Sequence, residues 1–341
     1  MRTFKRAAVF ILVNILAAGV LHFLLAEPTG FAYRMDDFKK ENYTTVGLGH
    51  SWAQNGVDPR GLETGEGDRA FNLGQGFLPL RAMPAVLGEL EKTSDIKRVY
   101  LDLCTMYWEK DYVLNAMTSP SIMGELSGWQ KAEYLRDVLL EQNYNNALFA
   151  YSLNRNSVES IPDTLRKKLD PAYRNGGRDE EYRRKAYEGQ GFFYVEGEGV
   201  PQEDGYYTVF SPENISPDAV RDFDRIVRHC EDKGIELICF MSALPPERIK
   251  HGDHDKIHAF YQGLCAERGL PLYDMNYVKW VYLPRTAADY TDVDGHMTGG
   301  MAKRQAELMR DITLSESPEA YFEKTYQAVL QGIAAYEAVE I

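Results

Sequence analysis

The sequence predicts an α/β fold, a three-layer α/β/α sandwich with a mainly parallel sheet, preceded by one N-terminal transmembrane helix. Short apolar runs alternate with helical patterns along most of the chain, which is typical of a parallel sheet covered by helices. These runs are continuously apolar, as expected of strands that are buried on both faces. A separate apolar segment, residues 7–26, is long enough to cross a bilayer as one helix.

The N-terminal segment begins with a basic stretch, residues 1–6, which contains Arg2, Lys5 and Arg6. The apolar run 7–26 ends in Ala26-Glu27-Pro28, a poor cleavage site, so we expect an uncleaved signal anchor; a cleaved signal peptide is the alternative. The basic start should stay in the cytoplasm, which puts the rest of the chain outside the cell membrane.

The remaining elements are predicted from the spacing of apolar residues and from the residues that begin and end helices and strands. We expect a polar stalk at residues 27–40 and a soluble domain at 41–341. A polar insertion, residues 108–216, interrupts this domain, and it has helical spacing at 128–150 and 178–187. We expect the insertion to lie at the carboxyl edge of the sheet, where active-site loops are found. The predicted strands are residues 45–49, 70–73, 97–104, 235–241 and 270–274, and the predicted helices are 80–92, 216–234, 254–268, 298–312 and 318–338.

The helix predicted at 216–234 has the clearest ends. Ser216 can cap it, Pro217 suits its first turn, and Gly234 suits its end.

Composition excludes some functions. The net charge of −13 argues against a nucleic-acid binder, which needs a basic surface. The four cysteines match no metal or redox spacing, and we interpret them as structural thiols.

Two segments carry candidate chemistry. Ser51 lies in Gly49-His50-Ser51-Trp52, where the first strand stops, and a serine at a strand-to-helix turn can present its hydroxyl at the sheet edge. A serine needs a base within hydrogen-bond reach, and the base needs an orienting acid. Late in the chain, His296 has Asp292 and Asp294 beside it. Alone, Ser51 could merely cap a helix, and His296 could be an ordinary surface histidine.

Both segments resemble blocks of the SGNH (GDSL-like) hydrolase superfamily, in its membrane-anchored bacterial branch of D-alanyl transfer and alginate O-acetylation proteins. The resemblance covers residues 45–110 and 216–312. It rests on the Gly-x-Ser block that continues through Asn55-Gly56 to Pro59, on Phe71-Asn72-Leu73-Gly74-Gln75-Gly76, and on His296 followed by Met297, Thr298 and Gly300.

The resemblance implies a flavodoxin-like sheet and a Ser-His-Asp acyl-enzyme mechanism without cofactor or metal. Ser51 would be the nucleophile and His296 the base, with Asp292 as the favoured acid and Asp294 as the alternative. The backbone N–H groups of Ser51 and Gly74 would hold the oxyanion.

The implied enzyme is a serine esterase or O-acyltransferase. Its substrate would be an acylated envelope glycan or a teichoic-acid-type polymer, and the resemblance implies a membrane-bound O-acyltransferase as a partner.

The chain departs from the family pattern at three points. His50 precedes the serine, where many relatives have Asp or Ser. The family's asparagine after the third strand is replaced by the run Leu103-Cys104-Thr105-Met106. Val293 stands where the acid usually lies, three residues before the histidine; we favour Asp292 because Gly295 gives the backbone room for one extra residue. These departures keep a second reading open, an inactive module that binds a glycan or a partner acyltransferase.

Other residues receive weaker assignments. His50, Trp52, Asn72, Tyr107 and Trp108 are candidates for lining a substrate pocket, although Tyr107 and Trp108 could equally pack beneath the insertion. Metal binding is a minor alternative for a histidine cluster, since two of its members are one helical turn apart; its residues are His251, His254 and His258.

Overall fold

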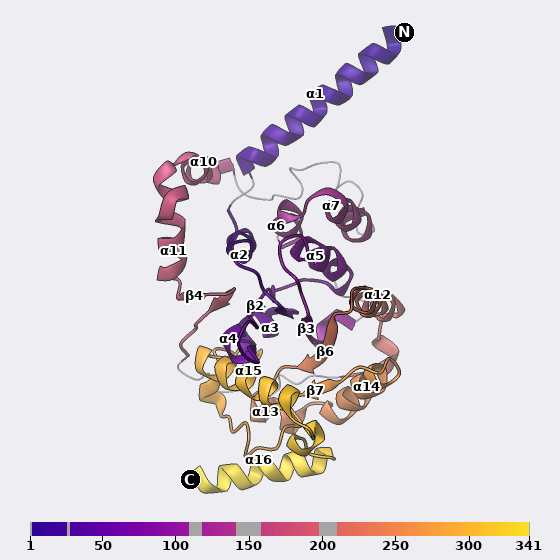
Figure 1. Ribbon diagram of the computed structural model, residues 1–341, viewed down its shortest axis with the longest axis vertical. Coiled ribbons are helices and arrows are strands. Elements are labelled where there is room, and N and C mark those ends of the chain that lie inside the picture. The colour runs from indigo at the N-terminus through magenta and orange to yellow at the C-terminus, as the bar shows by residue number, and fades with distance from the viewer. Residues whose placement is uncertain (1, 26–27, 109–117, 141–157, 198–209, 341) are drawn as a thin grey trace. The chain divides into compact units, whose positions relative to one another are not determined.

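The computed structural model describes residues 2–25, 28–108, 118–140, 158–197 and 210–340 (Figure 1). The chain divides into two compact units. Unit 1 contains Met1–Asp36 and Leu114–Arg184, and unit 2 contains Asp37–Val113 and Lys185–Ile341.

The elements that the structure describes in unit 1 are all helical, with short loops between them. Tyr33 and Tyr182 stack with ring centroids 3.9 Å apart, and Arg178 pairs with Asp36, so the N-terminal part is joined to the later part of this unit. Its helices are α1 (Arg2–Leu25), the start of α2 (Gly30–Phe38), α6 (Thr118–Glu125), α7 (Gly128–Tyr134) with a π-helical continuation (Leu135–Leu140), a 3₁₀ turn (Val158–Ser160), α10 (Ile161–Leu169), a π turn (Tyr173–Gly177) and α11 (Arg178–Arg184).

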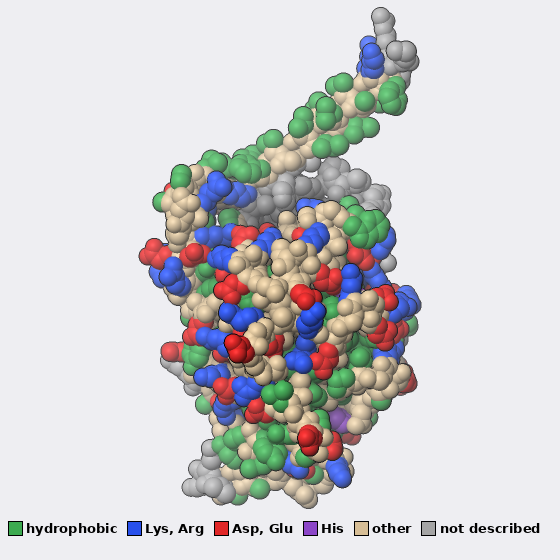
Figure 2. All heavy atoms as spheres, viewed as in Figure 1, with side chains coloured by type: hydrophobic (Ala, Val, Ile, Leu, Met, Phe, Trp, Pro, Cys, Tyr) green, Lys and Arg blue, Asp and Glu red, His purple; other side chains and the backbone are tan. Residues whose placement is uncertain are grey.

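The helix α1 is apolar and outward-facing. Hydrophobic side chains cover it in the space-filling view (Figure 2), and Phe10 is 70 % exposed. Its segment Phe4–Leu21 has the length and composition to cross a membrane, and α1 is the one such helix in the part of the chain that the structure describes. The N-terminal apolar helix predicted from the sequence is therefore present, with the properties of an anchor or of a signal sequence.

Unit 2 is built on a parallel sheet. Five strands lie in the order β2-β1-β3-β6-β7, and every neighbouring pair is parallel. The predicted strands are confirmed, with bounds β1 (Thr45–Leu48), β2 (Ala70–Asn72), β3 (Arg98–Asp102), β6 (Glu236–Met241) and β7 (Leu272–Asp274). A separate antiparallel hairpin consists of β4 (Tyr187–Gly189) and β5 (Phe192–Phe193).

Helices flank this sheet in two groups (Figure 1). The helix α15 packs with α3 and α4, whereas α12 packs with α5. The described helices of unit 2 are the end of α2, α3 (Ser51–Gly56), α4 (Pro59–Leu62), α5 (Met83–Leu90), α12 (Pro217–Lys233), α13 (Pro246–His251), α14 (His254–Ala266), α15 (Gly299–Leu314) and α16 (Tyr326–Glu340), with 3₁₀ turns at Leu80–Ala82, Thr105–Trp108, Pro212–Asn214, Ala287–Asp289 and Pro318–Tyr321.

The ends of α12 follow the sequence signals. The Ser216 side chain accepts a hydrogen bond from the Asp218 N–H, Pro217 occupies the first turn, and Gly234 has the left-handed φ of 67° that ends many helices. All four cysteines are buried and free, which agrees with structural thiols.

Two sequence expectations need correction, and a third is described only in part. Residues 30–38 of the expected stalk form the helix α2. The helix expected at 318–338 begins only at Tyr326, because Pro318–Tyr321 form a 3₁₀ turn and Phe322 pairs with Val278 in a β-bridge. The helix expected at 128–150 is described only to residue 140, and its remainder lies outside the described residues.

Candidate active site

Ser51 lies at the turn between β1 and α3, as the first residue of that helix. From β1 the chain runs to β2 on one side of the strand and then to β3 on the other, so the sheet order reverses here, and ligands of open α/β sheets bind at such a point. The turn needs glycine at position 49, because φ is 150° and a Cβ there would lie 2.6 Å from the Asp102 Cβ.

His296 contacts Ser51 from the far end of the chain. Its Nε2 lies 2.7 Å from the Ser51 Oγ, and its Nδ1 lies 2.5 Å from Asp292 Oδ2. Asp292 Oδ1 also accepts a hydrogen bond of 3.2 Å from the His296 backbone N–H. The structure thus brings together the serine, the histidine and the favoured acid in the geometry of a nucleophile, a base and an orienting carboxylate.

Asp294, the alternative acid, stabilises this loop through its backbone carbonyl group. Its carbonyl oxygen accepts hydrogen bonds from Trp52 Nε1 at 2.9 Å and from Arg248 Nη1 at 2.6 Å. Gly295 follows with φ of 89°, so the glycine turns the chain as the sequence predicted. Two side chains therefore hold the loop by the Asp294 carbonyl while Asp292 faces the histidine.

Asp292, Asp294 and His296 also offer atoms within 4.8 Å of one another, the one set of metal-type ligands found among the described residues. The 2.5 Å contact between His296 and Asp292 accounts for this proximity in part. The expectation that the site needs no metal stays a prediction.

A second imidazole contacts the serine. His50 Nδ1 lies 2.8 Å from Ser51 Oγ, and the His50 side chain is buried. Burial, followed by the proximity of His296, lowers the pKa of His50 to about 4, so this ring is neutral near pH 7. The sequence suggested that His50 lines a pocket but gave no sign of this contact.

Asn72 lies under the site and is fully buried. Its Nδ2 donates to the carbonyl oxygens of Ala53 and Val57 at 2.9 and 2.7 Å, and its Oδ1 accepts the Gly74 N–H at 2.8 Å. Asn72 therefore holds the loop after β2 against α3, in place of the pocket-lining role expected for it. The Gly74 N–H, expected to bind an oxyanion, would have to leave Asn72 to do so.

Gly74 is nonetheless required for packing. A Cβ at Gly74 would lie 2.5 Å from the Gln54 backbone nitrogen. Gly76 is also close to the nucleophile, since its Cβ position is 3.9 Å from the Ser51 Cβ, and its N–H donates to Gln54 Oε1 at 2.9 Å. The glycines of this block let the loop approach the nucleophile turn closely.

Asp102 is a residue of the site that sequence reasoning missed. It ends β3 beneath Gly49, is fully buried, and neither carboxyl oxygen has a hydrogen-bond partner among the described residues. Burial raises its pKa to about 8, and the backbone N–H groups of Ser242 and Ala53, which lie nearby without forming a hydrogen bond, oppose this only in part. An acid inside the apolar run Val-Tyr-Leu-Asp-Leu was the available signal.

Trp108, another pocket candidate, is not brought to Ser51. Trp108 is fully buried and packs edge-on against Phe223 and Tyr261, both at ring-centroid distances of 5.4 Å, so it packs in the core rather than lining a pocket. The side chain of Tyr107 lies outside the description.

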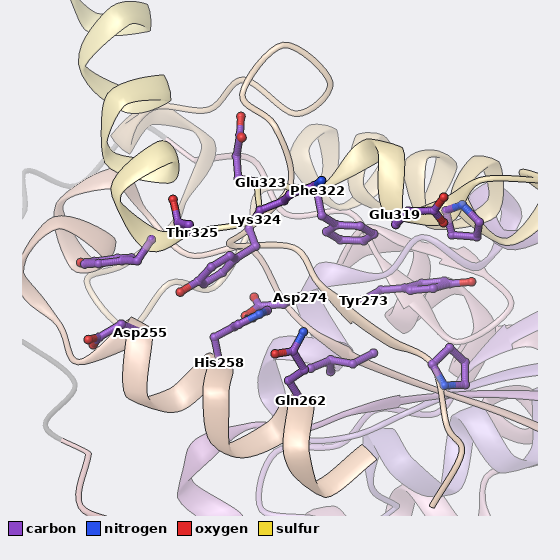
Figure 3. A pocket seen from close by; sticks show the side chains of 15 residues that line it. Asp255, His258, Gln262, Tyr273, Asp274, Glu319, Phe322, Glu323, Lys324 and Thr325 are labelled. Carbon is purple, nitrogen blue, oxygen red and sulfur yellow. The ribbon is translucent and has the colours of Figure 1, made fainter. Parts of the chain in front are cut away.

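The histidines considered for metal binding have separate partners. His254 is buried with its Nε2 3.1 Å from the Arg248 carbonyl oxygen. His258 lies 2.8 Å from Asp274 and stacks on Tyr277 at 3.7 Å. Figure 3 shows His258 directed toward Asp274 in a pocket of about 660 Å³, which α14, β7 and the segment 318–326 line. These pairs account for both histidines without a shared ligand.

Comparison of the chain with protein-family models finds no match, and no curated protein matches it. The functional case therefore rests on the geometry of the site.

Proposed function

We propose that the chain is a serine-dependent ester hydrolase or O-acyltransferase of the SGNH type, acting through an acyl-enzyme. One observation carries the proposal: the continuous line of contacts from Ser51 Oγ through His296 to Asp292, at 2.7 and 2.5 Å. His296 lies 245 positions after Ser51 in the chain, yet the three residues meet in the order that activates a serine.

In the first half of the reaction, Ser51 Oγ attacks the carbonyl carbon of an ester. His296 Nε2 takes the hydroxyl proton, while Asp292 holds the Nδ1–H and stabilises the imidazolium. The tetrahedral intermediate then collapses, and the leaving alcohol takes the proton from His296. An acyl group remains on Ser51.

Backbone donors stabilise the oxyanion. The Ser51 N–H is one donor, because the first residues of a helix lack an intrahelical acceptor for their N–H groups. The second donor comes from the loop after β2: Gly74, once its N–H is released by Asn72, or Gly76, whose N–H is held by a side chain. Every step uses side chains and backbone of the chain, so the mechanism calls for no cofactor or metal.

In the second half, water or a sugar hydroxyl attacks the acyl-enzyme and Ser51 is released. We assign the acyl acceptor to an envelope glycan or a teichoic-acid-type polymer, with a membrane-bound O-acyltransferase as a partner. In support, α1 has the composition of a signal anchor that would hold the catalytic domain outside the cell membrane. The sheet order and the two helix groups are those of a three-layer, flavodoxin-like sandwich, the architecture that we propose.

One observation favours a second candidate function, an inactive module that binds a glycan or an acyltransferase. The Gly74 N–H, the oxyanion donor expected from the family pattern, is bound to Asn72 in this structure. A module of this kind would keep the fold and the contacts but would not form an acyl-enzyme.

The test is covalent labelling of the detergent-solubilised full chain with a fluorophosphonate, followed by peptide mass spectrometry. We expect the label on Ser51, loss of labelling in Ser51→Ala and His296→Ala, and normal labelling in Ser317→Ala, an exposed control serine of the same unit. A folded wild-type chain that neither labels nor hydrolyses p-nitrophenyl acetate would exclude the enzyme and favour the binding module.

A further inference from the structure

The Ser51 hydroxyl contacts two imidazoles, one more than the proposed mechanism needs. His296 Nε2 lies 2.7 Å from Oγ and His50 Nδ1 lies 2.8 Å from it, both within hydrogen-bond range. His50 is held in this place by burial and by an edge-on contact with the Phe77 ring at 5.3 Å. The position of His50 beside the nucleophile is thus built into the turn.

The protons of the three groups can be assigned. Asp292 accepts at 2.5 Å from His296 Nδ1, so this nitrogen carries a proton, and the neutral His296 then has its lone pair at Nε2. The single proton of the Ser51 hydroxyl points to that lone pair. His50 Nδ1 can therefore form a hydrogen bond to Oγ only as a donor.

We propose that His50 is a further catalytic residue. Its Nδ1–H forms a hydrogen bond to Ser51 Oγ that strengthens as this oxygen leaves the acyl group. The inference rests on the acyl-enzyme mechanism proposed above. It assigns to His50 a part in deacylation that the serine, histidine and acid do not supply.

The bond changes in this step balance. When the acceptor oxygen has bonded to the acyl carbon, the bond from that carbon to Oγ breaks and its electron pair moves to Oγ. His296 Nε2 passes to Oγ the proton that it took from the attacking hydroxyl, and the His50 proton stays on Nδ1 throughout. Only the strength of the His50 hydrogen bond changes.

The effect differs between the two half-reactions. In the free enzyme the hydroxyl already accepts the His50 bond, so acylation gains little from it. In the acyl-enzyme Oγ is an ester oxygen, a weaker acceptor, and it becomes a strong one as it leaves with developing negative charge. An interaction that strengthens in the transition state accelerates the step, so His50 should speed deacylation selectively.

The kinetic test compares wild type with His50→Leu and His50→Asn, using p-nitrophenyl acetate in a stopped-flow burst experiment. Leucine removes the donor, whereas asparagine places an amide N–H near the position of Nδ1. For His50→Leu we expect a burst rate within about twofold of wild type and a deacylation rate lowered about tenfold, the loss of an ordinary hydrogen bond. His50→Asn should recover most of the deacylation rate.

Two kinetic results would overturn the inference. Equal slowing of both phases would indicate a structural role for His50, and unchanged deacylation in His50→Leu would exclude the donor. A wild-type chain that forms no acyl-enzyme would instead refute the proposed function itself, which keeps the two failures distinct.

An NMR measurement on the wild-type chain tests the same inference without depending on the folding of the variants. In ¹⁵N-histidine-labelled wild type, long-range ¹H–¹⁵N spectra report which ring nitrogen carries the proton. We expect the Nδ1–H tautomer for His50, and the Nε2–H tautomer would contradict the proposal.

Discussion

Replacing Asp292 by asparagine tests how His296 is oriented. Asp292 accepts two hydrogen bonds from His296, one from Nδ1 and one from the backbone N–H. An amide in its place can present its NH₂ group to Nδ1, which then takes the lone pair and moves the ring proton to Nε2. That nitrogen could no longer accept the Ser51 proton.

The magnitude follows from the exposure of the acid. Loss of the correct tautomer in a buried triad costs about 10⁴-fold in kcat. The Asp292 side chain is 41 % exposed, so water can partly replace its role, and we expect about 10³-fold. This corresponds to about 4 kcal/mol of transition-state stabilisation.

Asp294→Asn is the matched control, with the same chemical change two residues away. Its carboxylate forms no hydrogen bond with the described residues, and its structural contacts are made by the backbone carbonyl, which asparagine keeps. We expect kcat within about threefold of wild type. The measurement is the hydrolysis of p-nitrophenyl acetate at pH 7 by both variants; a larger loss in Asp294→Asn, or equal losses in both, would refute the assignment of Asp292.

Three further predictions concern the surroundings of the site. The pKa of Asp102 is raised to about 8, so the folded chain keeps a proton that the unfolded chain releases near pH 4. Between these two pH values the free energy of unfolding therefore falls by about 1.4 kcal/mol for each unit that the pH rises. Asp102→Asn should therefore gain stability relative to wild type between pH 5 and pH 8 in urea unfolding, and a constant difference would contradict this. Gly295→Ala forces a Cβ to 2.9 Å from Leu244 at φ of 89°, so we expect a loss of about 1–2 kcal/mol in unfolding free energy and a lower kcat; an unchanged Tm would argue against the strain. Trp52→Phe removes one donor to the Asp294 carbonyl and should cost about 1 kcal/mol in urea unfolding, with kcat reduced more than KM is raised; a change in KM alone would point to substrate contact instead.

Local signals were sufficient for the sheet and most of its helices. The five strands were recognised as apolar runs in the sequence. The end of α12 was recognised from Gly234, because glycine readily adopts the left-handed conformation that ends a helix. The segment 318–338 shows where such signals stop. Its helical spacing is real, but Glu323 N–H donates to the Tyr277 carbonyl and Lys279 N–H to that of Tyr321. This long-range pairing keeps Phe322 extended, directly after the 3₁₀ turn that ends at Tyr321. Spacing along the chain contains no information about such a pairing.

The site divides in the same way. The turn at Ser51 and the Gly295 conformation could be inferred from residue types, because each depends on the local backbone. Gly295 also favoured Asp292 over Asp294 as the acid. The hydrogen bonds from Trp52 and Arg248 that hold this loop could not be inferred, since these residues lie in other parts of the chain. The contacts of Asn72 could not be inferred for a related reason, because its Nδ2 donates to the carbonyl oxygens of Ala53 and Val57, which are distant in the sequence.

The buried groups beneath the nucleophile have a common consequence. His50 is kept neutral by burial, and a pKa of about 8 keeps most Asp102 molecules protonated at pH 7, so both lie next to the turn without carrying charge. A negative Asp102 below Gly49 would oppose the negative charge that develops on the oxyanion, and a positive His50 would repel the imidazolium that forms on His296. With both neutral, the charges that change near Ser51 during the reaction are those of His296 and of the oxyanion, while the Asp292 carboxylate stabilises the imidazolium. Burial under the turn thus sets protonation states as well as stability, and the glycines at 49 and 74 are what allow the backbone to close over these groups.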